Sequence, residues 1–465
     1  MNAETLFGKY ALQDPEPVRI ALEEELARTK DKIVVLDDDP TGIQTIHDLY
    51  VYTDWSRESF REGFADSRRA FFIMTNSRSF SEEVTEAVHR EVAGNLLAES
   101  RRFILVSRGD STLRGHYPLE TRVLRDALES GGLPVDGEII YPFFPEGGRY
   151  TAGNIHYARV GDEMIPVGET EFAKDKAFGY HSSDLAAWVE EKTCGAYRAA
   201  DVVCVTMEDL RSLDYDGIEK KLLSVRNFGK VIVNSLSYDD ARVFVTAFLR
   251  AAAKGKRFIF RSAAAAVKIL AGVTDKPLLD KELKSPGNPH GGLIVVGSHV
   301  RKTTAQLEAL RAREDIAFVE FNQHLVLEPE KLDAETERVL AEVTEKISGG
   351  KTVAMYTRRE RFDVNSGDKE DELRCAAAIS EKITSVVGRL PVRPAFIIAK
   401  GGITSSDIGT KGLSVKKALA LGQILPGVPV WLTGPESRFP DLAYVIFPGN
   451  VGDEDSLLRA VEKFD

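Results

Sequence analysis

Short apolar segments rich in β-branched and aromatic residues alternate along this sequence with longer segments in which apolar residues recur at helical spacing. Apolar runs of about four to eight residues bounded by turn residues predict buried strands. Strands that alternate with helices are typical of α/β domains. We therefore predict an α/β fold made of two α/β domains, each with a mostly parallel sheet flanked by helices.

The predicted strands occur in both halves of the chain. In the first half they cover residues 33–36, 49–52, 70–74, 103–106, 138–141, 202–205, 230–233 and 258–260. In the second half they cover residues 293–296, 317–321, 352–356, 395–398, 428–432 and 443–447. Among the segments between them, residues 81–99 place Val84, Val88 and Val92 on one face of a helix, which we expect to pack on a sheet.

A chain of 465 residues is long enough for about two or three domains. The periodic pattern breaks in the sequence KPLLDKELKSPGNPHGG, where Pro, Gly and Asn cluster. We therefore predict an N-terminal domain over residues 1–275, a linker over 276–291 and a C-terminal domain over 292–465. Residues 142–180 are irregular and rich in Gly and aromatic side chains, so we predict a functional loop region there.

The composition excludes several classes of protein. With 61 basic and 72 acidic side chains the net charge is −11, and no basic stripe indicates nucleic-acid binding. The three cysteines are too widely spaced for a paired metal site or a disulfide framework. No signal-like segment or long apolar run predicts a membrane association. We expect a cytoplasmic protein whose partner is a small molecule, and a homo-oligomer is compatible with the sequence.

Three consecutive carboxyl groups follow the first predicted strand in IVVLDDDPTGIQT. Asp37, Asp38 and Asp39 fall where open α/β sheets bind ligands, and Asp38 and Asp39 are candidate Mg²⁺ ligands. A turn-capping role is the structural alternative. The spacing of Asp37, Asp39 and Thr41 is also similar to the nucleophile motif of haloacid-dehalogenase-type phosphotransferases, in which Asp37 would attack phosphorus.

Two further polar segments follow strands in the same half. ILVSRGDSTLRGHYPLE supplies two arginine forks, a carboxylate and hydroxyls, and arginine suits a substrate carboxylate. YPFFPEGGRYTAGNIHY supplies donors among aromatic side chains, as a sugar-like ligand requires. The candidate residues of these segments are Arg108, Asp110, Ser111, Thr112, Arg114, Arg149, Asn154 and His156.

Glycine-containing turns follow three strands of the C-terminal half, in VVGSHVRKTT, IIAKGGITSS and FPGNVGDEDS. Turns of this kind present backbone N–H groups to anions, so together they predict a polyphosphate site. The candidate residues are Ser298, Gly401, Gly402, Thr404, Gly449, Asn450 and Gly452. Neither a Walker A sequence nor an opening GxGxxG is present, so the ordinary P-loop and dinucleotide-binding interpretations fail.

Taken together, the segments VLDDDPTGIQT, SRGDSTLRGHYPLE, YPFFPEGGRYTAGNIHY, AKGGITSSDIGTKGL and FPGNVG resemble the four-carbon acid sugar kinase family. The resemblance implies a kinase whose N-terminal domain binds a tetronate-type acid sugar and whose C-terminal domain binds ATP. It implies nucleotide contacts at Ser298, the 401–404 turn and the 449–452 turn. It implies sugar contacts at Asp37, Asp38, Arg108, Asp110, Ser111 and Arg114. In one departure, Ile403 stands where relatives carry an acidic residue, and Asp407 is a candidate substitute.

We therefore expect ATP- and Mg²⁺-dependent phosphorylation of the terminal hydroxyl of threonate, erythronate or a 3-oxo-tetronate. The hydroxyl proton passes to Asp110, Asp37 or Asp38, and the sequence does not choose among them. Nor does it choose the stereoisomer of the substrate. The alternatives are a haloacid-dehalogenase-like sugar phosphatase that uses Asp37, and a non-catalytic sensor of an acid metabolite and ATP.

Overall fold

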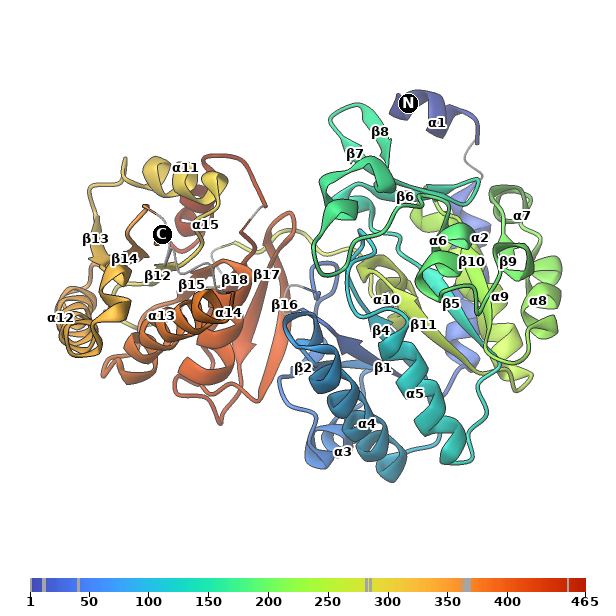
Figure 1. Cartoon of the computed structure of the whole chain (residues 1–465), viewed down its shortest axis with the longest axis horizontal. Helices are drawn as coiled ribbons and strands as arrows, with labels where there is room; N and C mark the ends of the chain where they lie inside the picture. Colours follow the sequence, from blue (N-terminus) through green and yellow to red (C-terminus); the bar gives the residue numbers. More distant parts are fainter. Residues whose placement is uncertain are drawn as a thin grey trace. The chain divides into compact units, whose positions relative to one another are not determined.

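The computed structural model describes the chain except residues 1, 11–13, 40–41, 281–282, 284–286, 361, 363–368 and 450. The chain forms two compact units, which are labelled by element in Figure 1. Unit 1 comprises Met1–Thr45 and Asp54–Asp275, and unit 2 comprises Ile46–Thr53 and Lys276–Asp465. Unit 2 therefore includes a short segment from the N-terminal part of the sequence, which no sequence pattern indicates.

Unit 1 is built around a parallel sheet. Its strands follow the order β3 (Ala70–Met74), β1 (Lys32–Asp37), β4 (Phe103–Arg108), β11 (Phe258–Ser262), β5 (Gly137–Tyr141), β10 (Gly229–Val233) and β9 (Val203–Val205). Consecutive residues of the central strands are buried, because helices cover both faces of such a sheet. The carboxyl ends of these strands lie along one edge, where ligands bind.

Helices connect these strands. They are α1 (Ala3–Gly8), α2 (Pro15–Arg28), α3 (Arg57–Ala65), α4 (Glu82–Glu99), α5 (Leu119–Ser130), α6 (Leu185–Lys192), α7 (Met207–Arg211), α8 (Tyr215–Ser224), α9 (Tyr238–Ala253) and α10 (Ala264–Ala271). Short 3₁₀ turns are η1 (Ser77–Ser79), η2 (Pro145–Gly147), η3 (Val167–Glu169), η4 (Glu171–Lys174) and η5 (Ala199–Asp201). None of the helices within the described residues is long and apolar enough to cross a bilayer.

Helix α4 confirms the predicted helix at residues 81–99 but buries a slightly different face. Val88 and Val92 are buried as predicted, whereas Val84 is 46% exposed. The buried face also includes Thr85 and His89. Val84 lies in the first turn, where the Ser81 hydroxyl caps the helix, and the buried stripe begins one residue later.

The predicted loop region at 142–180 contains a small antiparallel sheet. Its strands are β6 (Arg149–Ala152), β7 (Ile155–Val160) and β8 (Glu163–Pro166). The prediction of an irregular segment is wrong for these residues. The strands are short, and the glycines and aromatic residues among them hide the alternation by which strands are recognised.

Unit 2 has a mixed sheet. Its parallel part follows the order β13 (Ile316–Phe321), β14 (Thr352–Thr357), β12 (Leu293–Val296), β15 (Ile397–Lys400) and β18 (Ala443–Phe447). It continues in antiparallel pairings through β17 (Val428–Thr433), β16 (Lys417–Leu425) and β2 (Tyr50–Tyr52). The helical elements are α11 (Arg301–Leu310), η7 (Gln323–Leu327), α12 (Pro329–Ser348), α13 (Lys369–Arg389), α14 (Gly402–Asp407), the π-helical turn η8 (Ile408–Gly412) and α15 (Ser456–Glu462).

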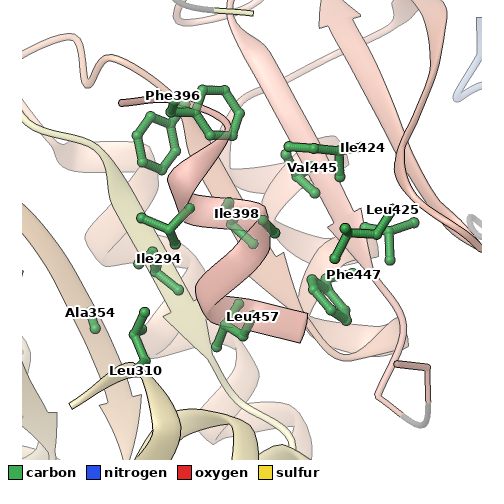
Figure 2. Packing of buried hydrophobic residues seen from close by; sticks show 14 of the residues in the cluster. Ile294, Leu310, Ala354, Phe396, Ile398, Ile424, Leu425, Val445, Phe447 and Leu457 are labelled. Atoms are coloured by element: carbon green, nitrogen blue, oxygen red, sulfur yellow. The ribbon is translucent and has the colours of Figure 1, made fainter. Parts of the chain in front are cut away.

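The core of unit 2 joins strands and helices of this sheet. Figure 2 shows Ile294 and Ile398 from the sheet beside Leu310 of α11 and Leu457 of α15, and all four side chains are fully buried. Leu279, from the predicted linker, belongs to the same core, and its backbone N–H donates to the Gln423 carbonyl. Part of the segment 276–291 is therefore packed on unit 2.

The predicted fold class is confirmed. Every predicted strand overlaps an observed one, and the structure adds β6, β7, β8 and β16. Strand β16 escapes prediction because its sequence, KALALGQIL, consists mainly of residues that favour helices, although alternate residues are buried.

Candidate active site

The carboxyl ends of β1 and β4 in unit 1 bring a carboxyl group and a guanidinium group together. Asp37 is directly opposite Arg108 in the register of the two strands. The Arg108 Nη1 group donates to Asp37 Oδ1 at 3.1 Å and lies 3.7 Å from Asp38 Oδ1. Arg108 Nε is buried and has no hydrogen-bond partner among the described residues, so this guanidinium retains a donor.

Arg78 binds the same acidic segment from η1, the turn that follows β3. Its Nε and Nη2 groups donate to the two carboxylate oxygens of Asp38 at 3.0 and 2.5 Å. Its Nη1 group donates to Asp39 at 3.3 Å. Sequence reasoning missed Arg78, although it follows the predicted strand 70–74 and therefore lies at the same edge of the sheet.

Burial makes two of these aspartates weak acids. It raises the pKa of Asp37 to about 7, although Arg108 opposes the shift. Burial also raises the pKa of Asp38, against the attraction of Arg78 and Arg108. Asp37 therefore titrates near neutral pH, which is the range in which a carboxylate is effective as a general base.

The loop after β4 adds a carboxylate whose pKa is lowered and not raised. Asp110 accepts hydrogen bonds from the Thr112 hydroxyl and from Arg114 Nε, the latter at 2.8 Å. Burial opposes its ionisation, but Arg78 and Arg114 outweigh burial and hold the pKa of Asp110 well below its usual range. Asp110 is therefore ionised at every physiological pH.

The region around β6 contributes a second cationic group to this loop. Arg149, the first residue of β6, and Arg114 both contact the Phe172 ring, with guanidinium carbons 5.4 and 5.1 Å from its centroid. Arg149 Nε is buried without a hydrogen-bond partner among the residues that the structure describes. Burial lowers the pKa of Arg149, and the nearby charge of Asp110 opposes that shift. These observations fit a guanidinium that binds an anionic ligand group.

His156 holds the polar loop in place. Its Nε2 atom lies 2.8 Å from the Ser111 carbonyl and its Nδ1 atom 2.9 Å from the Thr151 hydroxyl. Burial lowers the pKa of His156 to about 4, so the imidazole is neutral. The neutral ring donates from Nε2 to Ser111 and accepts from Thr151 at Nδ1. Ser111 itself is buried.

Arg261, near the end of β11, contacts this loop and was also missed by sequence reasoning. Its Nη2 group donates to the Arg114 carbonyl at 3.0 Å. A Cβ at Gly109 would lie 1.4 Å from Arg261 Nη1. Gly109 is therefore required because the guanidinium occupies the space of a side chain.

Asn154 is placed differently from the other predicted sugar-binding residues. It occupies the turn between β6 and β7 with φ of 63°. Its side chain accepts from Asn234 and donates to Cys204. These contacts secure the hairpin. None of them involves the Asp–Arg cluster, by which we mean the residues joined by the ion pairs described above: Asp37, Asp38, Asp39, Asp110, Arg78, Arg108 and Arg114.

Most of the predicted nucleotide-binding residues meet at one cavity of unit 2. The cavity has a volume of about 570 Å³. Its lining includes Ser298, Gly401, Gly402, Thr404 and Gly449, together with Ile403 and residues of α13 such as Ser380. Asn450 lies outside the described residues. Gly452 does not line the cavity, and a Cβ there would lie 2.5 Å from Ser456 at the turn before α15.

Close backbone approach explains the glycines of this cavity. A Cβ at Gly297 would lie 2.3 Å from the Thr404 hydroxyl. Gly401 has φ of +118°, and a Cβ there would lie 3.1 Å from Ser298 Cβ. By contrast, a Cβ at Gly402 would meet no atom within 4 Å. The turns thus pack closely, while Gly402 leaves open space.

We call the glycine turns that line this cavity, with Gly401, Gly402 and Gly449, the glycine cradle. Arg359 lies beside it, and no sequence signal identified this residue. Its Nη2 group donates to the Ser298 carbonyl at 2.5 Å and to the Thr304 hydroxyl at 3.0 Å. Its Nη1 group is buried and has no hydrogen-bond partner within the described ranges. An unsatisfied cationic donor beside a glycine-lined cavity fits the phosphates of a nucleotide.

Asp407, the candidate substitute for the acidic residue absent at Ile403, has other partners. It accepts from the Ser380 hydroxyl at 2.5 Å and pairs with Lys411 at 2.7 Å. It lines a larger, adjoining cavity of about 1180 Å³. Ile403 itself is 71% exposed and lines both cavities.

The predicted Mg²⁺ ligands Asp38 and Asp39 face Arg78. The part of the chain that the structure describes contains no group of three or more His, Cys, Asp or Glu side chains arranged around a metal site. Because both Asp38 oxygens accept from Arg78, these residues do not fit a resident cation.

Comparisons with known proteins find one match in the N-terminal part of the chain and another in the C-terminal part. Residues 33–270 match a family model described as a sugar-binding N-terminal domain, and residues 293–457 match one described as a nucleotide-binding C-terminal domain. A D-erythronate kinase of Heliobacterium modesticaldum is 25% identical over 346 residues, which cover 71% of this chain and 72% of that protein.

Solved structures share the fold. A protein from Haemophilus influenzae aligns over 93% of this chain and 100% of its own, with a TM-score of 0.62 and 17% identity. A protein from Salmonella typhimurium LT2 gives the same coverage, with a TM-score of 0.67 and 16% identity. Since the two family models occur in order and the first alone spans half of the sequence, this chain belongs to the four-carbon acid sugar kinase family.

Proposed function

We propose that this protein transfers the terminal phosphate of ATP to the terminal hydroxyl of a four-carbon acid sugar. Two observations, one in each unit, carry the proposal. The unit that matches a sugar-binding model holds a buried Asp–Arg cluster, and the unit that matches a nucleotide-binding model holds a glycine-lined cavity. The relative named D-erythronate kinase supports the substrate class.

Arg149 and Arg114 bind the carboxylate of the sugar. Both guanidinium groups contact the Phe172 ring, and Arg149 has a buried donor without a partner among the described residues. A carboxylate would satisfy that donor through a charge-assisted hydrogen bond. Arg114 is already paired with Asp110, so we expect Arg149 to contribute more to discrimination between an acid and a neutral sugar.

Asp37 is our preferred general base. In the reaction the sugar oxygen forms a bond to the terminal phosphorus, the bond from that phosphorus to ADP breaks, and the hydroxyl proton passes to a carboxylate. The pKa of Asp37, about 7, suits this role at neutral pH. If Asp37 is the base, kcat/KM for the acid sugar, measured at saturating ATP, rises with pH and levels off above about 7. If Asp110 is the base, the profile has no break in that range.

The glycine turns and Arg359 hold the nucleotide phosphates in unit 2. Mg²⁺ bound to the nucleotide would neutralise part of the phosphate charge. The protein's own contribution is to position the phosphates through backbone N–H groups and the Arg359 guanidinium.

A substrate panel tests the proposal. The purified protein with Mg²⁺ and ATP is incubated with each stereoisomer of threonate and erythronate and with 3-oxo-tetronates, and ADP formation is measured. Threitol and erythritol, which lack the carboxylate, are the matched controls. We expect ADP with at least one acid and none above background with the alcohols, and mass spectrometry should find one added phosphate on the sugar.

Assays with sugar phosphates and measurements of ligand binding separate the two alternatives. Release of phosphate from sugar phosphates without ATP would establish the phosphatase. Binding of ATP and an acid without ADP formation from any member of the panel would establish the sensor.

A further inference from the structure

Lys400 is a buried cation beneath the glycine turns of unit 2. It is the last residue of β15 and directly precedes Gly401. Its side chain is fully buried. The Nζ group donates to the Pro448 carbonyl at 2.7 Å and lies 3.9 Å from the centroid of the Phe447 ring. Lys400 thus links the turn after β15 to the turn after β18.

The charges around Lys400 are unusual for a buried lysine. Its strand lies between β12 and β18, and its register partners there, Val296 and Phe447, carry no charge. The charged side chain that affects the pKa of Lys400 is Lys302 of α11, which is also a cation. Within the described residues no carboxylate pairs with Lys400. Burial, reinforced by Lys302, lowers the pKa of Lys400 to about 7.

An anion in the adjoining cavity would raise the pKa of Lys400 again. Gly401 and Gly449, which follow the two strands that Lys400 joins, both line the cavity. A polyphosphate bound there would place several negative charges close to the ammonium group in a poorly solvated region, where an opposite charge strongly favours the protonated form of an amine.

We propose that Lys400 is the buried counter-charge of the nucleotide phosphates, and that nucleotide binding to unit 2 takes up a proton at this side chain. The inference rests on the proposed nucleotide site. Lys400 acts as a positioning residue, because it does not line the cavity and its charge reaches the phosphates across the turns that it holds.

Calorimetric titration of the full-length protein with ATP and Mg²⁺ tests the proposal. Titrations are repeated in buffers of different ionisation enthalpy, since the dependence of the observed heat on that enthalpy gives the number of protons taken up. We expect about half a proton per nucleotide at pH 7 and close to one at pH 8, where the nucleotide itself is fully ionised.

Two substitutions locate the proton. Lys400→Arg keeps the charge but does not titrate in this range, so proton uptake at pH 8 should disappear while affinity is largely retained. Lys400→Met removes the charge and should weaken ATP binding by about tenfold or more, with a smaller effect on adenosine. Lys351→Met is the matched control, because Lys351 is exposed and lies before β14, at the opposite end of the sheet.

The outcomes distinguish this inference from the proposed function. ATP binding without proton uptake by the wild-type protein would overturn the role of Lys400 alone. Absence of ATP binding to the wild-type protein would overturn both. Equal losses of ATP and adenosine affinity in Lys400→Met, with uptake unchanged in Lys400→Arg, would reduce Lys400 to a structural link between two turns. If Lys400→Met does not fold, the wild-type and Lys400→Arg titrations still decide the question.

Discussion

At Asp37 the proposed role as a general base and the stability of the fold place opposite demands on the carboxyl group. The carboxyl group is buried next to two other aspartates, and Arg108 compensates only part of the cost of its ionisation. In the unfolded chain its pKa is close to 3.8. The folded protein therefore binds an additional proton between about pH 4 and pH 7, and folding stability falls as pH rises through this window.

Replacement of Asp37 by Asn should remove this pH dependence. Relative to the wild type, Asp37→Asn should gain stability between pH 5 and pH 8, by at most about 4 kcal/mol, because the amide does not titrate. Thermal unfolding of both proteins without ligands at a series of pH values provides the measurement. Asp162→Asn, at an exposed site, is the control. Parallel curves for wild type and Asp37→Asn would mean that Asp37 is ionised throughout.

Arg149 allows a test of how the acid is recognised. Arg149→Gln keeps a polar side chain but loses the charge, so KM for the acid sugar should rise by roughly 10- to 100-fold. KM for ATP should change little. Steady-state kinetics with each substrate varied separately provide the measurement, and Arg101→Gln, at an exposed position, is the control. A similar rise in both KM values would contradict the assignment of Arg149 to the sugar.

Single residues differ in how far sequence predicts their place. Asp37 and Arg108 follow predicted strands, and the rule that ligands bind at the carboxyl edge of a sheet brings them together. Arg261 illustrates the limit of that rule. Its strand is distant in sequence but lies next to β4, and strand order is decided by tertiary packing.

At the scale of elements, the turns of unit 2 show which glycines serve the fold and which serve the cavity. Gly401 needs its positive φ, so any side chain there disturbs the turn itself. Gly402 begins α14, and a Cβ there would point into open space. A substitution at Gly402 therefore tests the cavity without straining the backbone.

Gly402→Leu should raise KM for ATP by roughly tenfold or more, because the new side chain occupies space next to the cradle. The melting temperature and the binding of the acid sugar should change little. Gly94→Leu is a matched control, since Gly94 is also helical and its Cβ would meet no atom within 4 Å. Unchanged ATP kinetics in Gly402→Leu would place the nucleotide elsewhere.

Elements that are strongly periodic are predicted well, and elements built from short or atypical strands are not. Helix α4 is recognised from its apolar spacing. The β6–β8 sheet is not, although it supplies Arg149 and His156 to the site. Its strands are formed by pairing with each other, and nothing in their local sequence requires that pairing.

For the whole molecule, the two units do not correspond to two uninterrupted pieces of sequence. Residues 46–53 belong to unit 2. Within that segment β2 pairs with β16, and the Asp48 and Ala420 backbone N–H groups donate to the Ala420 and Leu49 carbonyls. A C-terminal fragment that starts at Lys276 therefore lacks the strand that pairs with β16.

Such a fragment, residues 276–465, should be less stable than the same fragment to which residues 46–53 are joined by a flexible linker. Loss of the β2 pairing leaves the edge of β16 unpaired and should cost on the order of several kcal/mol. Urea denaturation compares the two fragments, and a linked segment of scrambled sequence is the control. Equal stability of all three proteins would show that β2 contributes nothing to unit 2.

The sequence by itself determined the fold class, most of the strands and the acidic and glycine-containing segments at their carboxyl ends. These features depend on local periodicity and on residue type. Only the tertiary structure decided that Arg78 joins the Asp–Arg cluster, that Arg261 contacts the loop after β4, that Arg359 lies beside the glycine cradle and that residues 46–53 complete unit 2. These contacts join positions that are far apart in the chain, and their energies depend on strand order and burial, which local sequence does not encode.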